Sequence, residues 1–367
     1  MKNNPLDDIV KCNVEISSPA SGDASFDSIL LIVPGPAKAP KGAKAITKVT
    51  AVSQADELLD YGYTTNETAY KALTVAFSQN PAPDSIYVCV RKMDDTGTTF
   101  ESITDTLVRA KSEAQFYGIY LCDFRNSGDL ADAISWTEAN EKLFAFEYTD
   151  IENFPVKNTS FYRSFALYSG SADGYGADEQ PEENKYAALA WMAKCFGYDP
   201  GTETWHLKEL ATVVPSVLST SEKKSLEENN LNSFLRYGGC NVTINGKTLA
   251  GEWIDVIRFR DWIKAEMQVN VFNVLKVNRK VPFTDAGIGL IEGKMDETLK
   301  RGQDVGGIAP NSFDADGNPV YGYVVTVPKA ADLTEAQRKS RKLPGCKWTA
   351  RLNGAIHAVE IEGFLSF

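Results

Sequence analysis

The sequence predicts a mixed α+β / α/β fold, in which an α/β layer comes first and a helix-rich region follows. Strand-like runs alternate with helical patterns between residues 26 and 150, which indicates a sheet with at least some parallel pairing. One long amphipathic segment follows at residues 252–277, and short segments of period-2 alternation lie near both ends of the chain. These patterns divide the chain into residues 1–22, 23–250, 251–345 and 346–367.

The first of these regions contains a strand followed by a linker. Residues 10–16 alternate between apolar and polar side chains, and one face carries Val10, Cys12, Val14 and Ile16. Such alternation is typical of a half-buried strand. The polar stretch SSPASGD comes next and indicates a loop. We therefore expect a short N-terminal strand that is detached from the body of the protein.

The α/β layer is predicted from apolar runs that are each followed by a helical pattern. Strands are expected at residues 26–33, 85–91, 116–123, 142–148 and 163–168, and helices at 53–60, 66–79, 101–116, 128–140 and 183–196. Residues 198–250 are less regular. Here the pattern predicts a helix at 226–235 and a hairpin within 240–249 that turns at Asn245-Gly246.

The helix predicted at residues 252–277 is apolar on more than one side. Trp253, Ile257 and Ile263 belong to one stripe, whereas Trp262 and Phe272 lie off it. A helix of this kind is usually buried on more than one side. Two alternatives remain open at this stage: the helix forms the spine of a domain, or one of its faces packs on a neighbouring subunit.

A second helix is expected from an N-cap at Thr284 or Asp285 to about Gly302. A turn at residues 312–321, a strand at 323–327 and a charged helix at 333–343 follow. The last strand-like segment places Ala355, His357, Val359 and Ile361 on one face, and Leu365 continues the same phase. The chain is thus predicted to end, as it begins, in an extended arm.

Composition excludes several classes of function. The 367 residues have a net charge of −11, which argues against general nucleic-acid binding because phosphate contacts need clustered Lys and Arg. The longest apolar run, residues 29–33, is too short to cross a membrane. The N-terminus lacks the features of a signal peptide, so we expect synthesis in a reducing cytoplasm and buried free thiols for the scattered cysteines.

Motifs that suggest chemistry are better explained by structure. The pattern Gly287-x-Gly289-x-x-x-Gly293 has the wrong spacing for a dinucleotide fingerprint and indicates helix packing. The segment DADGN at residues 314–318 resembles the start of a calcium loop, but Val325 occupies the twelfth position, so an Asx-rich turn is expected. With only two histidines, a zinc site is not expected either. The sequence therefore predicts no catalytic, cofactor-binding or metal site.

Several segments, in order, resemble contractile-tail sheath proteins of phages and phage-like particles. They are the alternating N-terminal strand, FDSILLIV, FSQNPAPDSIYVCVR, TWHLKELATVVPSVLS, LEENNLNSFLRYGG, GEWIDVIRFRDWIKAEMQ, KVPFTDAGIGLIE and LNGAIHAVEIEGFLSF. Each segment is weakly specific alone. The resemblance rests on the order of the segments and on the amino-acid sequence of residues 251–291. The chain is short for the family, so the outer insertion domains of larger sheaths are expected to be missing.

The resemblance implies an outer α/β sandwich-like domain and a tube-proximal domain with long helices and a small sheet completed by extended terminal arms. It implies a homo-oligomer of stacked rings around an inner tail tube, with baseplate and tail terminator proteins as further partners. It implies no cofactor, no direct nucleic-acid contact, and contact with a membrane only through penetration of a target envelope. The subunit is then made in the host cytoplasm and resides in the tail of a virion or phage-like particle.

Two sets of residues are assigned on this basis. Pairing between subunits is expected for the terminal arms, through Val10, Cys12, Val14, Ile16, His357, Val359, Ile361 and Leu365. The helix after Thr284 is expected to face the tube through Glu292, Lys294, Lys300 and Arg301, although a solvated helix face explains these charges equally well.

Two other functions remain open. One is the sheath of a headless, phage-derived bacteriocin or injection system. The other, from a different class, is a cytoplasmic α/β enzyme that binds a cofactor on the layer at residues 26–150, although no turn in that layer carries a phosphate fingerprint.

Overall fold

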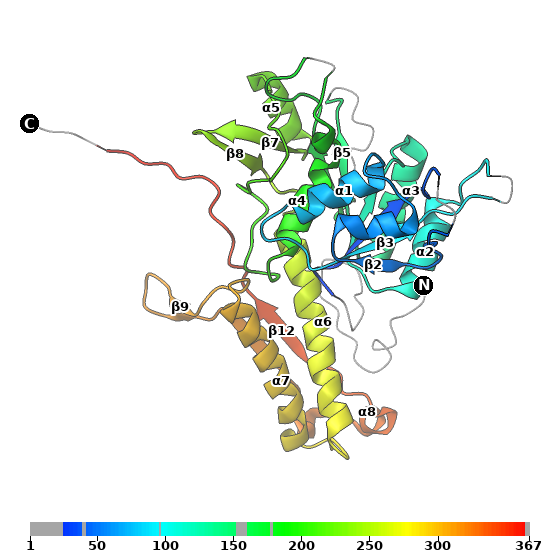
Figure 1. Cartoon of the computed structure of the whole chain (residues 1–367). Coiled ribbons are helices and arrows are strands. Elements are labelled where there is room, and N and C mark those ends of the chain that lie inside the picture. Colours follow the sequence, from blue (N-terminus) through cyan, green and yellow to red (C-terminus); the bar gives the residue numbers. More distant parts are fainter. Residues whose placement is uncertain (1–24, 39–41, 95–96, 152–159, 177–178, 364–367) are drawn as a thin grey trace, which may run out of the picture.

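The computed structural model describes residues 25–38, 42–94, 97–151, 160–176 and 179–363. Within them, the N-terminal two thirds of the chain form a mixed eight-stranded sheet in the order β2-β3-β1-β4-β5-β6-β7-β8 (Figure 1). Its strands are β1 (Ile29–Val33), β2 (Thr50–Val52), β3 (Ile86–Val90), β4 (Gly118–Leu121), β5 (Leu143–Tyr148), β6 (Ser164–Tyr168), β7 (Asn232–Tyr237) and β8 (Cys240–Ile244).

The sheet is parallel in its centre and antiparallel at both edges. Neighbouring strands from β3 to β7 run parallel, and β2 and β8 each close an edge in the opposite direction. Strand β1 is buried on both faces, because Leu30 and Ile32 enter one apolar cluster and Leu31 enters the other. This explains its continuous apolar sequence, and the predicted α/β layer with parallel pairing is confirmed.

Helices cover both faces of this sheet. One face packs against the 3-10 helix η2 (Ala55–Tyr61), α1 (Thr68–Phe77), η3 (Glu182–Tyr186), α4 (Ala187–Phe196) and the start of α6 (Ile254–Val277). The other face packs against α2 (Ile103–Glu113), α3 (Ser127–Asn140) and α5 (Thr220–Glu228). The mixed α/β domain expected from the sequence is therefore present, and it is called the outer domain below.

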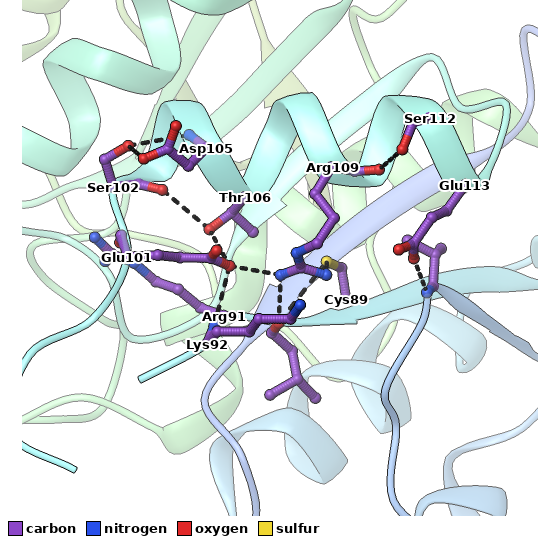
Figure 2. A network of polar contacts seen from close by, with 12 residues as sticks. Cys89, Arg91, Lys92, Glu101, Ser102, Asp105, Thr106, Arg109, Ser112 and Glu113 are labelled. Atoms are coloured by element: carbon purple, nitrogen blue, oxygen red, sulfur yellow. Dashed lines mark hydrogen bonds and ion pairs between the residues drawn. The ribbon is translucent and has the colours of Figure 1, made fainter. Parts of the chain in front are cut away.

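A polar network fixes α2 to the end of β3 (Figure 2). Arg109 of α2 donates to Glu101 Oε1 at 2.5 Å and to the carbonyl of Val90 at 2.9 Å. Arg91, which follows β3, forms a two-pronged pair with Asp129 of α3 at 2.8 and 3.0 Å. Each guanidinium group is paired with a carboxylate of the same domain, and these contacts hold the layers of the domain together.

Two expectations for residues 226–249 are wrong. The predicted helix at 226–235 is replaced by α5, which starts earlier because Ser219 and Glu222 form a capping box, and by strand β7. The hairpin that leads into β8 turns at Gly238-Gly239 rather than at Asn245-Gly246. Both glycines have positive φ, at 56° and 88°, as a tight two-residue hairpin loop requires.

The second region is a long antiparallel helix pair below the sheet (Figure 1). Helix α6 extends from the outer domain, and α7 (Asp285–Asp304) returns along it. Thr284 is the N-cap of α7, as expected, and its hydroxyl accepts from the amide of Gly287 at 3.2 Å. The 3-10 helix η4 (Ala330–Asp332) and α8 (Glu335–Ser340) lie at the far end, where Arg338 donates to the carbonyl of Phe283 at 3.1 Å.

The first half of α6 is buried on all sides and carries charges into the outer domain. Asp261 accepts from Arg163 at 2.6 and 3.0 Å and from the hydroxyl of Tyr117 at 2.7 Å. Arg258 donates to Glu203 at 2.6 Å and to the carbonyl of Phe26 at 2.9 Å. Within the single chain, α6 is the spine that joins the two regions, and packing of one of its faces on a neighbouring subunit stays a prediction.

Burial of Glu141, at the edge of this network, makes ionisation of its carboxyl group unfavourable. It raises the pKa of Glu141 to about 7, even though Lys264 lies 3.7 Å away. Because the folded-state pKa lies above that of the unfolded chain, Glu141 contributes stability below about pH 4.5 that is lost as the pH rises to 7.

The Glu141→Gln substitution should remove this pH dependence, because glutamine does not ionise. Between pH 5 and pH 8 the variant should gain on the order of 2 kcal/mol of unfolding free energy relative to the wild type. Urea unfolding at the two pH values measures the gain. Glu209→Gln, at an exposed site, is the control, and an equal pH response in both variants would contradict the prediction.

Candidate functional site: the small sheet and the terminal arm

A small two-stranded sheet lies beside α7. Strand β11 (Tyr323–Thr326) pairs antiparallel with β12 (Lys347–Ala350), with Val324 opposite Thr349 and Val325 opposite Trp348. Tyr323, Val325 and Trp348 pack against the main apolar cluster. Along these residues, and within the described part of the chain, each strand has only the other as partner. The sheet therefore has edges at which a further strand can add.

The strand predicted for the C-terminal arm is expected to pair with another subunit, and within the single chain it stays a prediction. Residues 351–363 form no strand apart from an isolated bridge between Leu352 and Ile308, whereas β12 at 347–350 was not predicted. The expected face is nevertheless exposed: Val359 is 71% and Ile361 88% accessible. In Figure 1 this segment runs away from the body of the protein. It is an extended apolar segment that lacks a strand partner within the described residues.

One residue of this segment docks on the outer domain. The ring of His357 stacks on that of His206, with 4.4 Å between centroids and 29° between planes. Trp253 meets the His357 ring edge-on at 4.6 Å, and Thr204 Oγ1 lies 2.9 Å from His357 Nε2. The two histidines are about 150 residues apart in sequence, so no local pattern signalled this contact.

Three of the four charges assigned to the tube-facing surface form ion pairs within the subunit. Lys294 pairs with Glu297, Lys300 with Asp304 at 2.5 Å, and Arg301 with Glu266 of α6 at 2.7 Å. Glu292 lines a shallow groove of about 530 Å³ between α7 and β11. Lys300 and Arg301 remain exposed beside one another on the surface of α7.

The groove itself was not anticipated from the sequence. Besides Glu292, its walls are formed by Gly289, Gly293, Asp296, Tyr321, Tyr323, Val324 and Val325. The two glycines have no neighbouring atom where a Cβ would stand, so they leave the surface of α7 flat. An acidic and aromatic groove thus runs along the small sheet.

Neither a metal site nor a membrane segment is found in the part of the chain that the structure describes. No three His, Cys, Asp or Glu side chains gather there as metal ligands would, and none of its helices is long and apolar enough to span a bilayer. Residues 314–318 form the expected Asx turn, in which Asp314 Oδ1 accepts from the amides of Asp316 at 3.0 Å and Asn318 at 2.8 Å.

The remaining predicted arm residues cannot be placed. Val10, Cys12, Val14, Ile16 and Leu365 lie outside the described residues.

Comparison with known families gives one match. Residues 254–364 match the C-terminal domain of E217 tail sheath gp31-like proteins. This range contains α6, α7, the small sheet and most of the terminal arm. No curated protein matches the chain.

Solved structures resemble nearly the whole chain. The sheath of the anti-feeding prophage in the contracted state has a TM-score of 0.65 and 13% identity, with 97% of each chain covered. The contracted PVC sheath of an extracellular contractile injection system has a TM-score of 0.62 and 10% identity, covering 97% of this chain and 96% of that one. The sheath tail protein Lin1278 of Listeria innocua has a TM-score of 0.53 and 10% identity, at 84% and 90% coverage.

Proposed function

We propose that this chain, which has the fold of contractile sheath proteins and carries a tail sheath C-terminal domain at residues 254–364, is the subunit of a contractile tail sheath. It polymerises as stacked rings around an inner tail tube and contracts to drive that tube through a target envelope. The observation that carries the proposal is the coverage of the fold, because contracted sheath subunits align with 97% of the chain.

The small sheet and the arms supply the link between subunits. Strand β11 or β12 presents free backbone groups, and the exposed arm of a neighbour satisfies them by adding a strand. About six ladder bonds at roughly 1 kcal/mol each do not offset the ordering of those residues, which costs roughly 1–2 kcal/mol apiece. Burial of Val359, Ile361 and Leu365, and of Val10, Val14 and Ile16 in the other arm, makes the addition favourable.

Contraction is then a two-state rearrangement of rigid bodies. The buried contacts of Asp261 and Arg258 lock α6 into the outer domain, so that each subunit moves as one piece while its arms stay paired. The contracted packing has the lower free energy, and no nucleotide is consumed. The role is structural rather than enzymatic, with the tube, baseplate and terminator proteins as partners.

The particle is the tail of a virion or of a headless particle, assembled in the host cytoplasm. Two of the aligned sheaths come from an anti-feeding prophage and an extracellular injection system, which keeps the headless particle as a specific second candidate.

Electron microscopy of the purified subunit at increasing concentration, with and without the tube protein, tests the proposal. Hollow tubes or stacked rings are expected. Small uniform particles at every concentration, even with the tube present, would contradict it.

Contact with the tube is tested at Lys300, whose charge projects from α7. Lys300→Glu is expected to reduce co-assembly with the tube protein about tenfold or more, since one interfacial charge reversal costs more than 1 kcal/mol. Co-sedimentation measures the loss. Lys224→Glu is the matched control, because Lys224 is also exposed on a helix and also pairs with an acid four residues on. Equal co-sedimentation of both variants would contradict a contact between α7 and the tube. The charges of α7 would then lie on a solvated helix face.

A further inference from the structure

The contact between the two histidines has a feature that strand addition does not explain. His357, Val359 and Ile361 share one face of an extended chain, yet His357 is half-buried against the outer domain whereas the other two are exposed. The arm therefore touches its own subunit at His357, and the side chains of Val359 and Ile361 that follow are exposed. An arm held at His357 has less freedom to reach the sheet of a neighbour than an arm that is released there.

We propose that Thr204, His206 and Trp253 form a binding site for the imidazole of His357, which holds the C-terminal arm on its own subunit until protonation of the two histidines releases it. The site is built from three separate elements: the loop after α4, the N-cap of α6 and the arm. Its effect on polymerisation rests on the proposed function, whereas the docking itself does not.

Hydrogen bonds orient the rings in their neutral form. The amide of Asn245 donates to His206 Nδ1 at 3.1 Å, so this nitrogen must be unprotonated for the bond to exist. The amide of His206 donates to Thr204 Oγ1 at 3.3 Å, which holds the hydroxyl near His357 Nε2. Two neutral imidazoles stack favourably at this distance, whereas two imidazolium ions repel each other.

The surroundings also disfavour positive charge. Burial lowers the pKa of both His206 and His357, and for His206 the charge of His357 lowers it further, against a smaller raising effect of a backbone hydrogen bond with His357. Lys208 lowers the pKa of both rings, and Lys247 adds a second cation 5.2 Å from the ring of Trp253. Of the two acids that lie closest to these loops, Glu203 is paired with Arg258 at 2.6 Å, and burial raises the pKa of Asp255 to about 6, so that its negative charge is lost in acid together with the docking.

The sign of the pH dependence follows from these directions. Both histidines have lower pKa values in the docked state than in the released state. Protonation of the two rings therefore favours the released state. Docking is therefore complete above the ordinary histidine pKa of about 6.5 and is lost as the pH falls below it. Acid should release the arm.

Nuclear magnetic resonance of the full chain labelled with ¹³C-histidine measures this directly, because the protein contains only two histidines. Both imidazoles should titrate below the pH of a free histidine, and the His357 signal should narrow and reach the shift of an exposed ring once the arm is released. In His357→Ala, the pKa of His206 should rise towards its ordinary value. The matched control Ile361→Ala, on the exposed part of the arm, should leave it unchanged.

An unchanged His206 titration in His357→Ala would overturn the docking site. Thr204→Val should give a smaller change in the same direction, as it removes one hydrogen bond and leaves the stacking. Light scattering at pH 5.5 and 7.5 then tests the consequence: the wild type should polymerise several-fold faster at pH 5.5, and His357→Ala equally fast at both. If the titration behaves as expected and no polymer forms, the proposed function fails while the docking site stands.

Discussion

Replacing Val359 and Ile361 together with serine is expected to raise the concentration needed for polymerisation about 100-fold or more, while the subunit stays folded. Both side chains are exposed in the single chain, so their loss removes no contact from its core. In the assembly both side chains are buried, and burial of each contributes roughly 1.5–3 kcal/mol to the free energy of association. Every 1.4 kcal/mol is a factor of ten in affinity. Sedimentation of polymer at graded concentrations measures the change.

Ile356→Ser is the matched control for this variant. Ile356 is of the same residue type and is also exposed at 82%, but it lies on the opposite face of an extended arm. It should shift the polymerisation threshold far less. A double variant that assembles at the wild-type concentration, or a control that is equally damaging, would contradict the assignment of the Val359 and Ile361 face to the neighbouring subunit.

Replacing Asp261 with asparagine is expected to lower the unfolding free energy by about 3–5 kcal/mol. Burial alone would raise the pKa of Asp261, but Arg163 and Arg260 lower it, so the carboxylate stays charged and holds two buried guanidinium groups. Asparagine removes the negative charge that both of them contact in this closed interior. Because the pKa of Asp261 is lowered, the wild type itself should lose stability as the pH falls below about 4.

Urea unfolding at neutral pH compares this variant with Asp304→Asn. Asp304 is an exposed partner of Lys300 on α7, and surface pairs of this kind contribute about 0–1 kcal/mol. Similar losses in the two variants would mean that the Asp261 network does not lock α6 to the outer domain. The outer domain and the α6–α7 region could then move relative to each other, and the rigid-body description of contraction would be wrong.

Most of the outer domain could be predicted from the sequence because its strands are buried on both faces. Strands β1, β3, β4 and β5 are short apolar runs followed by clear helical patterns, and parallel sheets require this composition. The errors at residues 226–249 arose where the local signals compete. The capping box at Ser219 starts a helix ahead of the apolar residues, and two turn sequences, Gly238-Gly239 and Asn245-Gly246, lie within ten residues of each other.

The small sheet and the histidine site were harder to predict because neither has a local signature. Strand β12 is only four residues long, and its pairing with β11 depends on contacts across more than twenty residues of chain. His206 and His357 meet only because the arm folds back on the loop after α4. The apolar alternation of the arm was visible in the sequence, but its partner strand is not part of the same subunit in the account proposed here.

A helical reconstruction of the assembled tubes, at a resolution that separates strands, tests directly whether the terminal arms link neighbouring subunits. The β11–β12 sheet is expected to gain at least one strand from a terminal arm of another copy, with Val359 and Ile361 buried in the added strand. A sheet that remains two-stranded, with His357 of every copy still stacked on its own His206, would contradict it.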